Sequence, residues 1–163
     1  MVIRDALERD LPEIVDIYNV AIPGRLATAD TEPVTVESRR AWFAEHDATR
    51  PLWIATIDST IAGWLSFQSF YGRPAYHATA EVSVYVSPDR QRQGIGRALL
   101  ANAADAAPRL ALKTLLGFIF GHNEPSLRLF GKLGFQRWAL LPRVAELDGI
   151  ERDLLIVGRR TAA

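Results

Sequence analysis

A glycine-containing segment between a predicted strand and a predicted helix constrains the fold of this chain more than any other feature. The segment is Gln91-Arg-Gln-Gly-Ile-Gly96, and it follows a valine-rich run that ends at Val86. A helical spacing of apolar residues then continues to Ala107, where Pro108 ends it. The next apolar run, Thr114 to Phe120, has the length and composition of a buried strand. The sequence therefore predicts a strand-loop-helix-strand crossover.

The same segment has the residue types of a phosphate-binding loop. Glycines let the backbone approach an anion, and the first N–H groups of the following helix have no partner inside that helix. The helix dipole adds to the attraction, and Arg90, Arg92 and Arg97 could supplement it. The spacing is neither that of a nucleotide-triphosphate loop nor that of the dinucleotide fingerprint. The alternative is a glycine-permitted turn before a helix with solvated arginines.

The remaining sequence predicts an α/β fold with a mixed sheet. Further strands are expected at Val2–Ala6, Leu52–Ile57, Ile61–Phe70, Thr79–Val86 and Asp153–Gly158. Helices are expected after a capping box at Asp10-Leu-Pro-Glu13, from Thr35 to about His46, and from Asn123-Glu-Pro-Ser126 to a glycine cap at Leu133-Gly134-Phe135. The polar pair Asp58-Ser59 predicts a hairpin, and Ala21 to Val34 lacks either period and is expected to form a loop.

Composition limits the possible functions. A chain of 163 residues that is 48% apolar is expected to form a single domain, residues 1–163. Its 19 basic residues balance 19 acidic ones, which disfavours nucleic acid and anionic membranes as partners. It contains no cysteine, and its three histidines lack the spacing of a metal triad, so we expect no metal. Neither a leader nor a bilayer-spanning run is visible, so we expect a soluble, cytoplasmic protein.

Two ordered motifs carry a family resemblance. Gln91-x-x-Gly94-x-Gly96 after Val84-Tyr85-Val86 resembles motif A of the GCN5-related N-acetyltransferase (GNAT) superfamily, and Asn123 to Phe135 resembles the downstream helix of that family. The resemblance narrows to the phosphinothricin and methionine sulfoximine acetyltransferase branch. Its marks are Tyr18-Asn19, Thr31-Glu32-Pro33, Ala41-Trp42-Phe43, Phe70-Tyr71-Gly72-Arg73-Pro74 and Glu81-Val-Ser-Val-Tyr-Val86. It runs almost from Ile3 to Arg159.

The resemblance implies the GNAT fold, a mixed and mostly antiparallel twisted sheet flanked by helices, with splayed central strands. It also implies acetyl-CoA as co-substrate. The expected cofactor-binding residues are Val84, Tyr85, Val86, Arg92, Gln93, Gly94, Ile95, Gly96, Arg97, Asn123 and Ser126. The alternative for Asn123 is a helix cap, since asparagine is common at that position, and the two roles are compatible.

The resemblance further implies that Glu81 lies at the substrate amine. Strand alternation puts Glu81, Ser83 and Tyr85 on one face, and a carboxylate there could accept the amine proton directly or through water. The expected substrate-binding residues are Arg73, Pro74, Ala75, Glu81, Val82 and Ser83. Arg73 could pair with a carboxylate or phosphinate, the alternative being a surface arginine in a turn. Phe130 stands where many relatives carry a tyrosine, so no general acid is assigned.

The function that follows from this resemblance is acetyl transfer from acetyl-CoA to the α-amine of a small amino acid or analogue. Methionine sulfoximine, methionine sulfone and phosphinothricin are the expected acceptors, and a homodimer is implied. Two alternatives stay open. One is a GNAT enzyme for another amine, such as a peptide N-terminus, a polyamine or an aminoglycoside. The other is a non-catalytic acyl-CoA-binding module.

Overall fold

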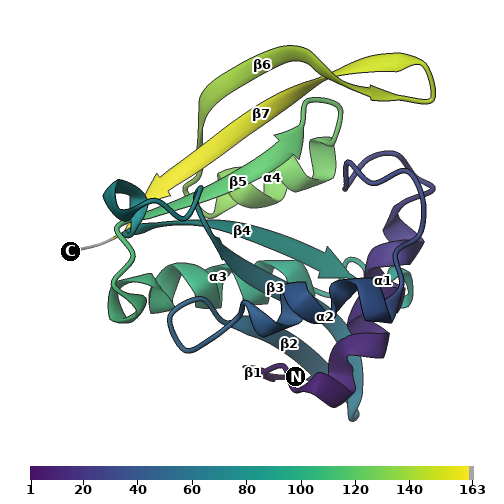
Figure 1. The fold of residues 1–163 in the computed structure, drawn as a ribbon, viewed down its shortest axis with the longest axis vertical. Coiled ribbons are helices and arrows are strands. Elements are labelled where there is room, and N and C mark those ends of the chain that lie inside the picture. Colours follow the sequence, from purple (N-terminus) through teal and green to yellow (C-terminus); the bar gives the residue numbers. More distant parts are fainter. Residues whose placement is uncertain (162–163) are drawn as a thin grey trace.

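The fold is built on a single seven-stranded sheet with the order β1-β2-β3-β4-β5-β7-β6 (Figure 1). The computed structural model describes residues 1–161. The strands are β1 (Val2–Asp5), β2 (Leu52–Ile57), β3 (Thr60–Ser69), β4 (Thr79–Val86), β5 (Thr114–Phe120), β6 (Gln136–Leu147) and β7 (Ile150–Arg160). The α-helices are α1 (Leu11–Ala21), α2 (Val36–Ala44), α3 (Ile95–Ala106) and α4 (Glu124–Lys132).

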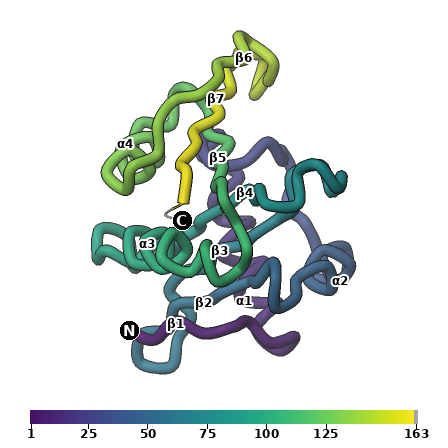
Figure 2. The backbone as a smooth tube through the Cα atoms, turned by 90° about the vertical axis from the view of Figure 1, so that its left-hand side faces the viewer, coloured from purple at the N-terminus to yellow at the C-terminus, as the bar shows by residue number. Residues whose placement is uncertain are grey.

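The sheet is mixed, as the sequence predicts. β4 and β5 are parallel, and the other neighbouring strands pair antiparallel. The parallel pair follows from the crossover, because α3 carries the chain from the end of β4 back to the start of β5. Figure 2 shows α3 and α4 on one side of the sheet and α2 on the other, and α1 also packs against β3 and β4. The expected mixed and mostly antiparallel sheet flanked by helices is confirmed.

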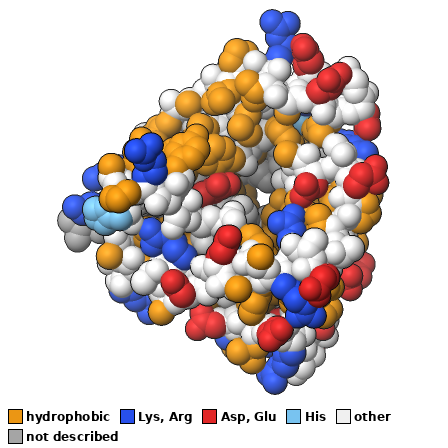
Figure 3. All heavy atoms as spheres, viewed as in Figure 1, with side chains coloured by type: hydrophobic (Ala, Val, Ile, Leu, Met, Phe, Trp, Pro, Cys, Tyr) orange, Lys and Arg blue, Asp and Glu red, His pale blue; other side chains and the backbone are white. Residues whose placement is uncertain are grey.

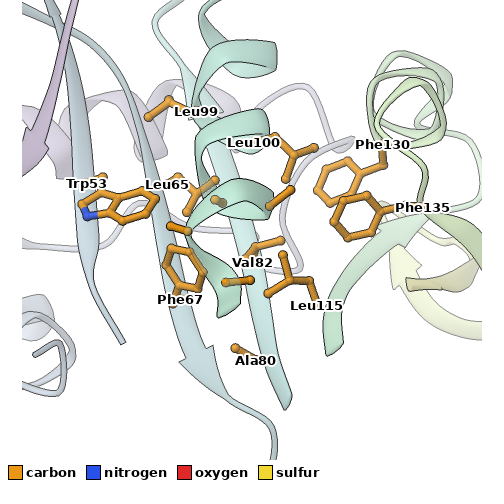
Figure 4. Close-up of a cluster of buried hydrophobic side chains, with 14 of the residues drawn as sticks. Trp53, Leu65, Phe67, Ala80, Val82, Leu99, Leu100, Leu115, Phe130 and Phe135 are labelled. Carbon is orange, nitrogen blue, oxygen red and sulfur yellow. The ribbon is translucent and has the colours of Figure 1, made fainter. Parts of the chain in front are cut away.

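The main hydrophobic core lies between the sheet and α3 (Figure 4). Leu65 and Val82 point from the central strands toward Leu99 and Leu100 of the helix, and all four side chains are almost completely buried. Burial of each such side chain contributes about 1.5–3 kcal/mol. A second cluster, which includes Trp64, lies beneath α1 on the opposite face. The two clusters hold β3 and β4 rigidly between helices.

Two predicted helix boundaries are confirmed. The Thr35 hydroxyl accepts a hydrogen bond from the Ser38 N–H (3.0 Å) and begins α2. Gly134 follows α4 with a φ of +84°, the left-handed conformation that glycine adopts readily. Both ends are therefore determined locally.

The predicted capping box at Asp10-Leu-Pro-Glu13 is wrong. A 3-10 turn, Glu8–Asp10, precedes α1, so the Asp10 backbone is already helical. The Asp10 carboxylate points back, where it accepts a hydrogen bond from the Leu7 N–H (2.7 Å) and pairs with Arg4 (2.8 Å). The pKa of Asp10 is lowered, chiefly by the hydrogen bond from Arg4.

The carboxyl-terminal region contains a hairpin, where the sequence predicts a single strand at Asp153–Gly158. β6 and β7 pair along most of their length, although bulges interrupt β6 between Arg137 and Ala139 and between Leu141 and Ala145. Most β6 side chains are exposed, so the strand lacks the alternation that marks a half-buried strand. The turn residues Asp148 and Gly149, at φ +52° and +77°, carry the signal that could have predicted it. No helix within residues 1–161 has the length and hydropathy needed to cross a membrane.

Candidate active site

The central strands β4 and β5 separate and leave a cavity between them. They pair through Thr79, Ala80 and Glu81, with Glu81 opposite Leu116, and then diverge (Figure 1). The cavity has a volume of about 460 Å³ and opens on the surface as a hollow bordered by hydrophobic and charged side chains (Figure 3). It is lined by Ala27, Thr28, Ala29, Glu81, Val82, Ser83, Val84, Tyr85, Phe118, Ile119, Phe120, Asn123, Ser126, Phe130, Val144, Ala145 and Leu154.

The backbone of β4 presents hydrogen-bonding groups to this cavity. The Ser87 N–H donates a hydrogen bond to the Ala62 carbonyl of β3 (2.8 Å), so the backbone groups of Ser87 point toward β3. Backbone groups alternate in direction along a strand, so the N–H and C=O groups of Val84 and Val86 point away from β3. Beyond Glu81 that direction faces the gap left by β5. The splayed strand therefore offers donors and acceptors to an extended ligand.

Glu81 is the carboxyl group at the point where the strands separate. Its side chain lines the cavity, and burial raises the pKa of Glu81 above its ordinary value. Across the β3–β4 ladder it lies opposite Gln68. A carboxyl group with a raised pKa holds a proton more strongly and is a better general base near neutral pH.

The loop before α3, residues 91–97, has the backbone geometry of a phosphate-binding loop, and we name it the anion cradle. Arg92 and Gly94 have positive φ values of 61° and 77°. The Gly94 carbonyl accepts the Ala98 N–H (2.9 Å), which is the first helical hydrogen bond of α3. The N–H groups of residues 95–97 thus precede the helical ladder and are available to an anion. Arg92 and Arg97 are exposed beside them.

Gly96 joins the cradle to the cavity. A Cβ atom at this position would lie 3.3 Å from Leu129 and 3.5 Å from Val86, with Val84 at 3.7 Å. A larger residue would push α3 away from β4 and α4. Val84 also lines the cavity, so the start of α3 packs directly against a wall of the cavity.

A loop segment, residues 25–29, crosses one side of the cavity, and we name it the strap. Three consecutive carbonyls of the strap accept hydrogen bonds from side chains distant in sequence: Arg25 from His122 Nε2 (2.8 Å), Leu26 from Asn123 Nδ2 (3.2 Å) and Ala27 from the Tyr85 hydroxyl (3.1 Å). Arg25 also pairs with Asp148 in the β6–β7 turn (3.0 Å). The sequence did not assign a role to His122 or to the strap, because no local pattern encodes such contacts.

Asn123 is a helix cap and a tether at the same time. Its Oδ1 accepts the Ser126 N–H (3.2 Å) at the start of α4, while its Nδ2 donates to the strap. The side chain is buried and lines the cavity. The cap predicted as an alternative is therefore confirmed, and the contact with a cofactor arm stays a prediction.

The predicted substrate-binding residues fall into two groups. Val82 and Ser83 line the cavity with Glu81. Arg73, Pro74 and Ala75 lie in the exposed connection between β3 and β4 and are absent from the cavity lining. That connection also holds the exposed aromatic side chains of Tyr71 and Tyr76, which pack near Phe70.

Phe130 forms an apolar wall of the cavity. Its ring packs edge-on against Phe135 (4.9 Å between centroids) and covers Gly117, where a Cβ would lie only 2.7 Å from the Phe130 ring. The nearby Tyr85 hydroxyl already donates to the strap. Within residues 1–161, no group of three or more His, Cys, Asp or Glu side chains is arranged to hold a metal ion.

A sequence model of the Acetyltransferase (GNAT) family matches residues 11–135. The chain belongs to the GNAT family. The match includes β4, the anion cradle, α3 and α4, and it ends before the β6–β7 hairpin.

Named relatives of this GNAT protein include amino-acid-analogue acetyltransferases. It is 51% identical to the Bacillus subtilis protein named "Putative phosphinothricin acetyltransferase YwnH", over 98% of both chains. It is 32% identical to a Salmonella typhimurium L-methionine sulfoximine/L-methionine sulfone acetyltransferase, over 94% of this chain and 91% of the relative. A Sinorhizobium meliloti phosphinothricin acetyltransferase, crystallised with acetyl-CoA, superposes with a TM-score of 0.93 at 26% identity, covering 99% of this chain and 88% of that one.

Proposed function

We propose that this protein transfers an acetyl group from acetyl-CoA to the α-amine of a small amino acid or analogue. Methionine sulfoximine, methionine sulfone and phosphinothricin are the compounds of choice, and transfer is direct within a ternary complex. The observation that carries the proposal is Glu81, a partly buried carboxyl group at the point where β4 and β5 separate. The names of its relatives support the same class of acceptor.

The cofactor would be held along β4 and at the start of α3. The N–H groups of residues 95–97, with the Arg92 and Arg97 side chains, suit a pyrophosphate. Gln93 and Gly94 shape that loop, and Asn123 and Ser126, which line the cavity, would border the arm. When bound, acetyl-CoA supplies the thioester. The outward-facing backbone of Val84 and Val86 would align an extended arm in the gap between the strands.

Glu81 would accept the proton of the attacking amine, directly or through water. Amines with a pKa of about 8 to 10 are mostly protonated at neutral pH, so a base speeds the reaction. The Val86 N–H points away from β3, on the side where β5 has left β4, and would stabilise charge on the carbonyl oxygen. Phe130 offers no proton, and a thiol with a pKa near 8.5 is a tolerable leaving group without one.

The test is to follow free CoA release by purified protein with acetyl-CoA and a panel of acceptors. The panel holds common amino acids, their sulfoximine, sulfone and phosphinate analogues, polyamines, an aminoglycoside and a peptide. Turnover that is fastest with the analogues or small amino acids supports the proposal. A preference for polyamines, aminoglycosides or the peptide would show that the acceptor belongs to that class and not to the small amino acids. Tight acetyl-CoA binding without any turnover would indicate a binding module.

We further propose that residues 1–163 act as one domain in a cytoplasmic homodimer. The absence of cysteine suits a reducing compartment. The side chains of Trp138, Leu140 and Val144 on β6 are exposed and would be partly covered in a dimer. A second subunit could also bring Arg73 into a complete site. Light scattering on the purified protein tests this assembly, and a monomeric mass at micromolar concentration would refute it.

A further inference from the structure

A row of facing side chains leads away from Glu81 on the side of the sheet opposite α3. The β3–β4 register pairs Glu81 with Gln68, Ser83 with Ser66 and Tyr85 with Trp64. Hydrogen-bonded and non-hydrogen-bonded pairs alternate along an antiparallel ladder, and Ser87 and Ala62 form a hydrogen-bonded pair. The three pairs above are therefore also hydrogen-bonded, with Cα atoms about 5.5 Å apart. Side chains of one such row point to the same face. The candidate base thus stands at one end of a polar row that ends in two stacked aromatic rings.

A second, smaller cavity lies over this row. Its volume is about 150 Å³, and α1, α2 and the loop before α2 cover it. It is lined by Ile14, Val15, Tyr18, Val34, Arg39, Trp42, Trp64, Ser66, Gln68, Ser83 and Tyr85. Ser83 and Tyr85 line both cavities, so the two cavities are adjacent along β4.

The walls of this smaller cavity are aromatic and rigid. Trp64 stacks on Tyr85 with 4.7 Å between ring centroids, and Trp42 meets Trp64 edge-on at 5.6 Å. The Arg39 guanidinium lies over the Tyr18 ring at 4.8 Å and pairs with Asp30 (3.0 Å). Tyr18 also donates a hydrogen bond to the Asp30 carboxylate. These contacts keep one fixed positive group beside an otherwise neutral lining.

We infer that the smaller cavity is the subsite for the side chain of the acceptor amino acid, an inference that rests on the proposed function. With the α-amine at Glu81, the side chain extends past Ser83 toward Trp64. A cavity of about 150 Å³ holds a group the size of benzene, roughly six non-hydrogen atoms. The subsite therefore selects neutral or anionic side chains of up to that length, and Ser66 and Ser83 can bond to polar atoms along them.

The charge of Arg39 disfavours acceptors with a cationic side chain. A positive side chain in this subsite would face the Arg39 guanidinium, which lines the cavity, whereas the carboxylate of its partner Asp30 does not, so the two positive groups would repel. Asp30 is already paired with Arg39 and with the Tyr18 hydroxyl. Lysine and ornithine should accordingly be poorer acceptors at the α-amine than methionine sulfone, which has a similar length and no charge.

The size of the subsite is tested with Val34→Phe, which fills it from the loop. We expect the ratio of kcat/KM for methionine sulfone over alanine to fall at least tenfold. Val20→Phe adds the same ring at an exposed position of α1 and should leave that ratio unchanged. KM for acetyl-CoA and thermal unfolding report whether the variant is folded. A ratio that stays within twofold of wild type in folded Val34→Phe overturns the inference.

The charge of the subsite is tested with Arg39→Met. We expect the rate with lysine relative to methionine sulfone to rise at least fivefold, because the guanidinium is gone and Asp30 is freed. An unchanged relative rate in a folded variant contradicts the charge assignment. Wild-type protein without turnover of any amino acid would refute the proposed function instead. Turnover with unaltered side-chain preference in both variants would refute the subsite alone.

Discussion

Glu81 pairs with Leu116 across β4 and β5, and the ladder between the two strands ends at that pair. Before Glu81, β4 is hydrogen-bonded to β3 on one edge and to β5 on the other. After Glu81 only the edge that pairs with β3 is bonded, and the other edge is open to the cavity. The carboxyl group gains a fixed position from the first half of β4 and access to a ligand from the second half. Both the reactivity of Glu81 and its effect on stability follow from this position.

Glu81→Gln should lower kcat/KM for the best acceptor at pH 7 by about 10²–10⁴, the usual contribution of a general base. The amide has the same shape but cannot accept the amine proton. The Kd for CoA should stay within twofold, because the anion cradle is unchanged. Glu13→Gln, at an exposed position of α1, is the control. A Glu81→Gln enzyme with at least half the wild-type rate would remove this residue as the base.

The same substitution should stabilise the fold at neutral pH. Burial raises the pKa of Glu81, so the folded state prefers the protonated form, and this preference is lost as pH rises through the folded pKa. The variant has no charge to bury. Its melting temperature should exceed that of wild type at pH 7–8, and the difference should shrink as pH falls toward 4.5, the ordinary pKa of the group. A difference that is constant from pH 4 to pH 8 would contradict burial as its cause.

Substitutions at Asn123 should separate its two roles. Asn123→Ala loses both the Ser126 cap and the bond to Leu26, and it should destabilise the protein by about 1–3 kcal/mol. Asn123→Ser restores a capping oxygen but not the donor to the strap. In chemical denaturation the serine variant should recover part of the loss, while hydrogen exchange of residues 25–29 should be faster than wild type in both. Equal stability of the two variants would mean that the cap contributes nothing.

Gly94 should be replaceable by asparagine more readily than by alanine. No atom lies within 4 Å of a Cβ at this position, so the cost arises from its φ of +77°. The left-handed conformation costs an ordinary residue about 1–2 kcal/mol, and asparagine tolerates it better. CoA binding measured by calorimetry should weaken more for Gly94→Ala than for Gly94→Asn. Equal affinities would show that the loop conformation is not needed for binding.

The sequence predicts those parts of the molecule that local chemistry determines. The crossover and the anion cradle follow from a valine-rich run, glycines and an alanine-rich helix, because each residue type restricts its own backbone. Thr35 and Gly134 mark helix boundaries for the same reason. The position of Glu81 on the open face follows from strand alternation and from the family resemblance together, since alternation alone cannot say where β5 leaves β4.

Other parts depend on contacts between distant segments. β6 has few buried side chains, so no periodic pattern distinguishes it from a loop. The bonds from His122 and Asn123 to the strap span 97 residues and end on backbone carbonyls, which leave no trace in the sequence. Asp10 has the residue type of a cap, yet a preceding turn commits its carboxylate to Arg4 and Leu7. Contacts of this kind are determined by tertiary packing and not by local sequence.

The strap is anchored through its backbone, and this has a consequence for how its residues can change. Any amino acid supplies a carbonyl, so Leu26 and Ala27 are free to vary in side chain as long as the path of the chain is kept, whereas the Arg25 side chain is also bound to Asp148. His122, Asn123 and Tyr85, which donate, are not. Mutational drift can therefore remodel the side chains that border the cavity while the segment itself stays in place. Acceptor selectivity can therefore change by mutation in the strap without a change in the fold.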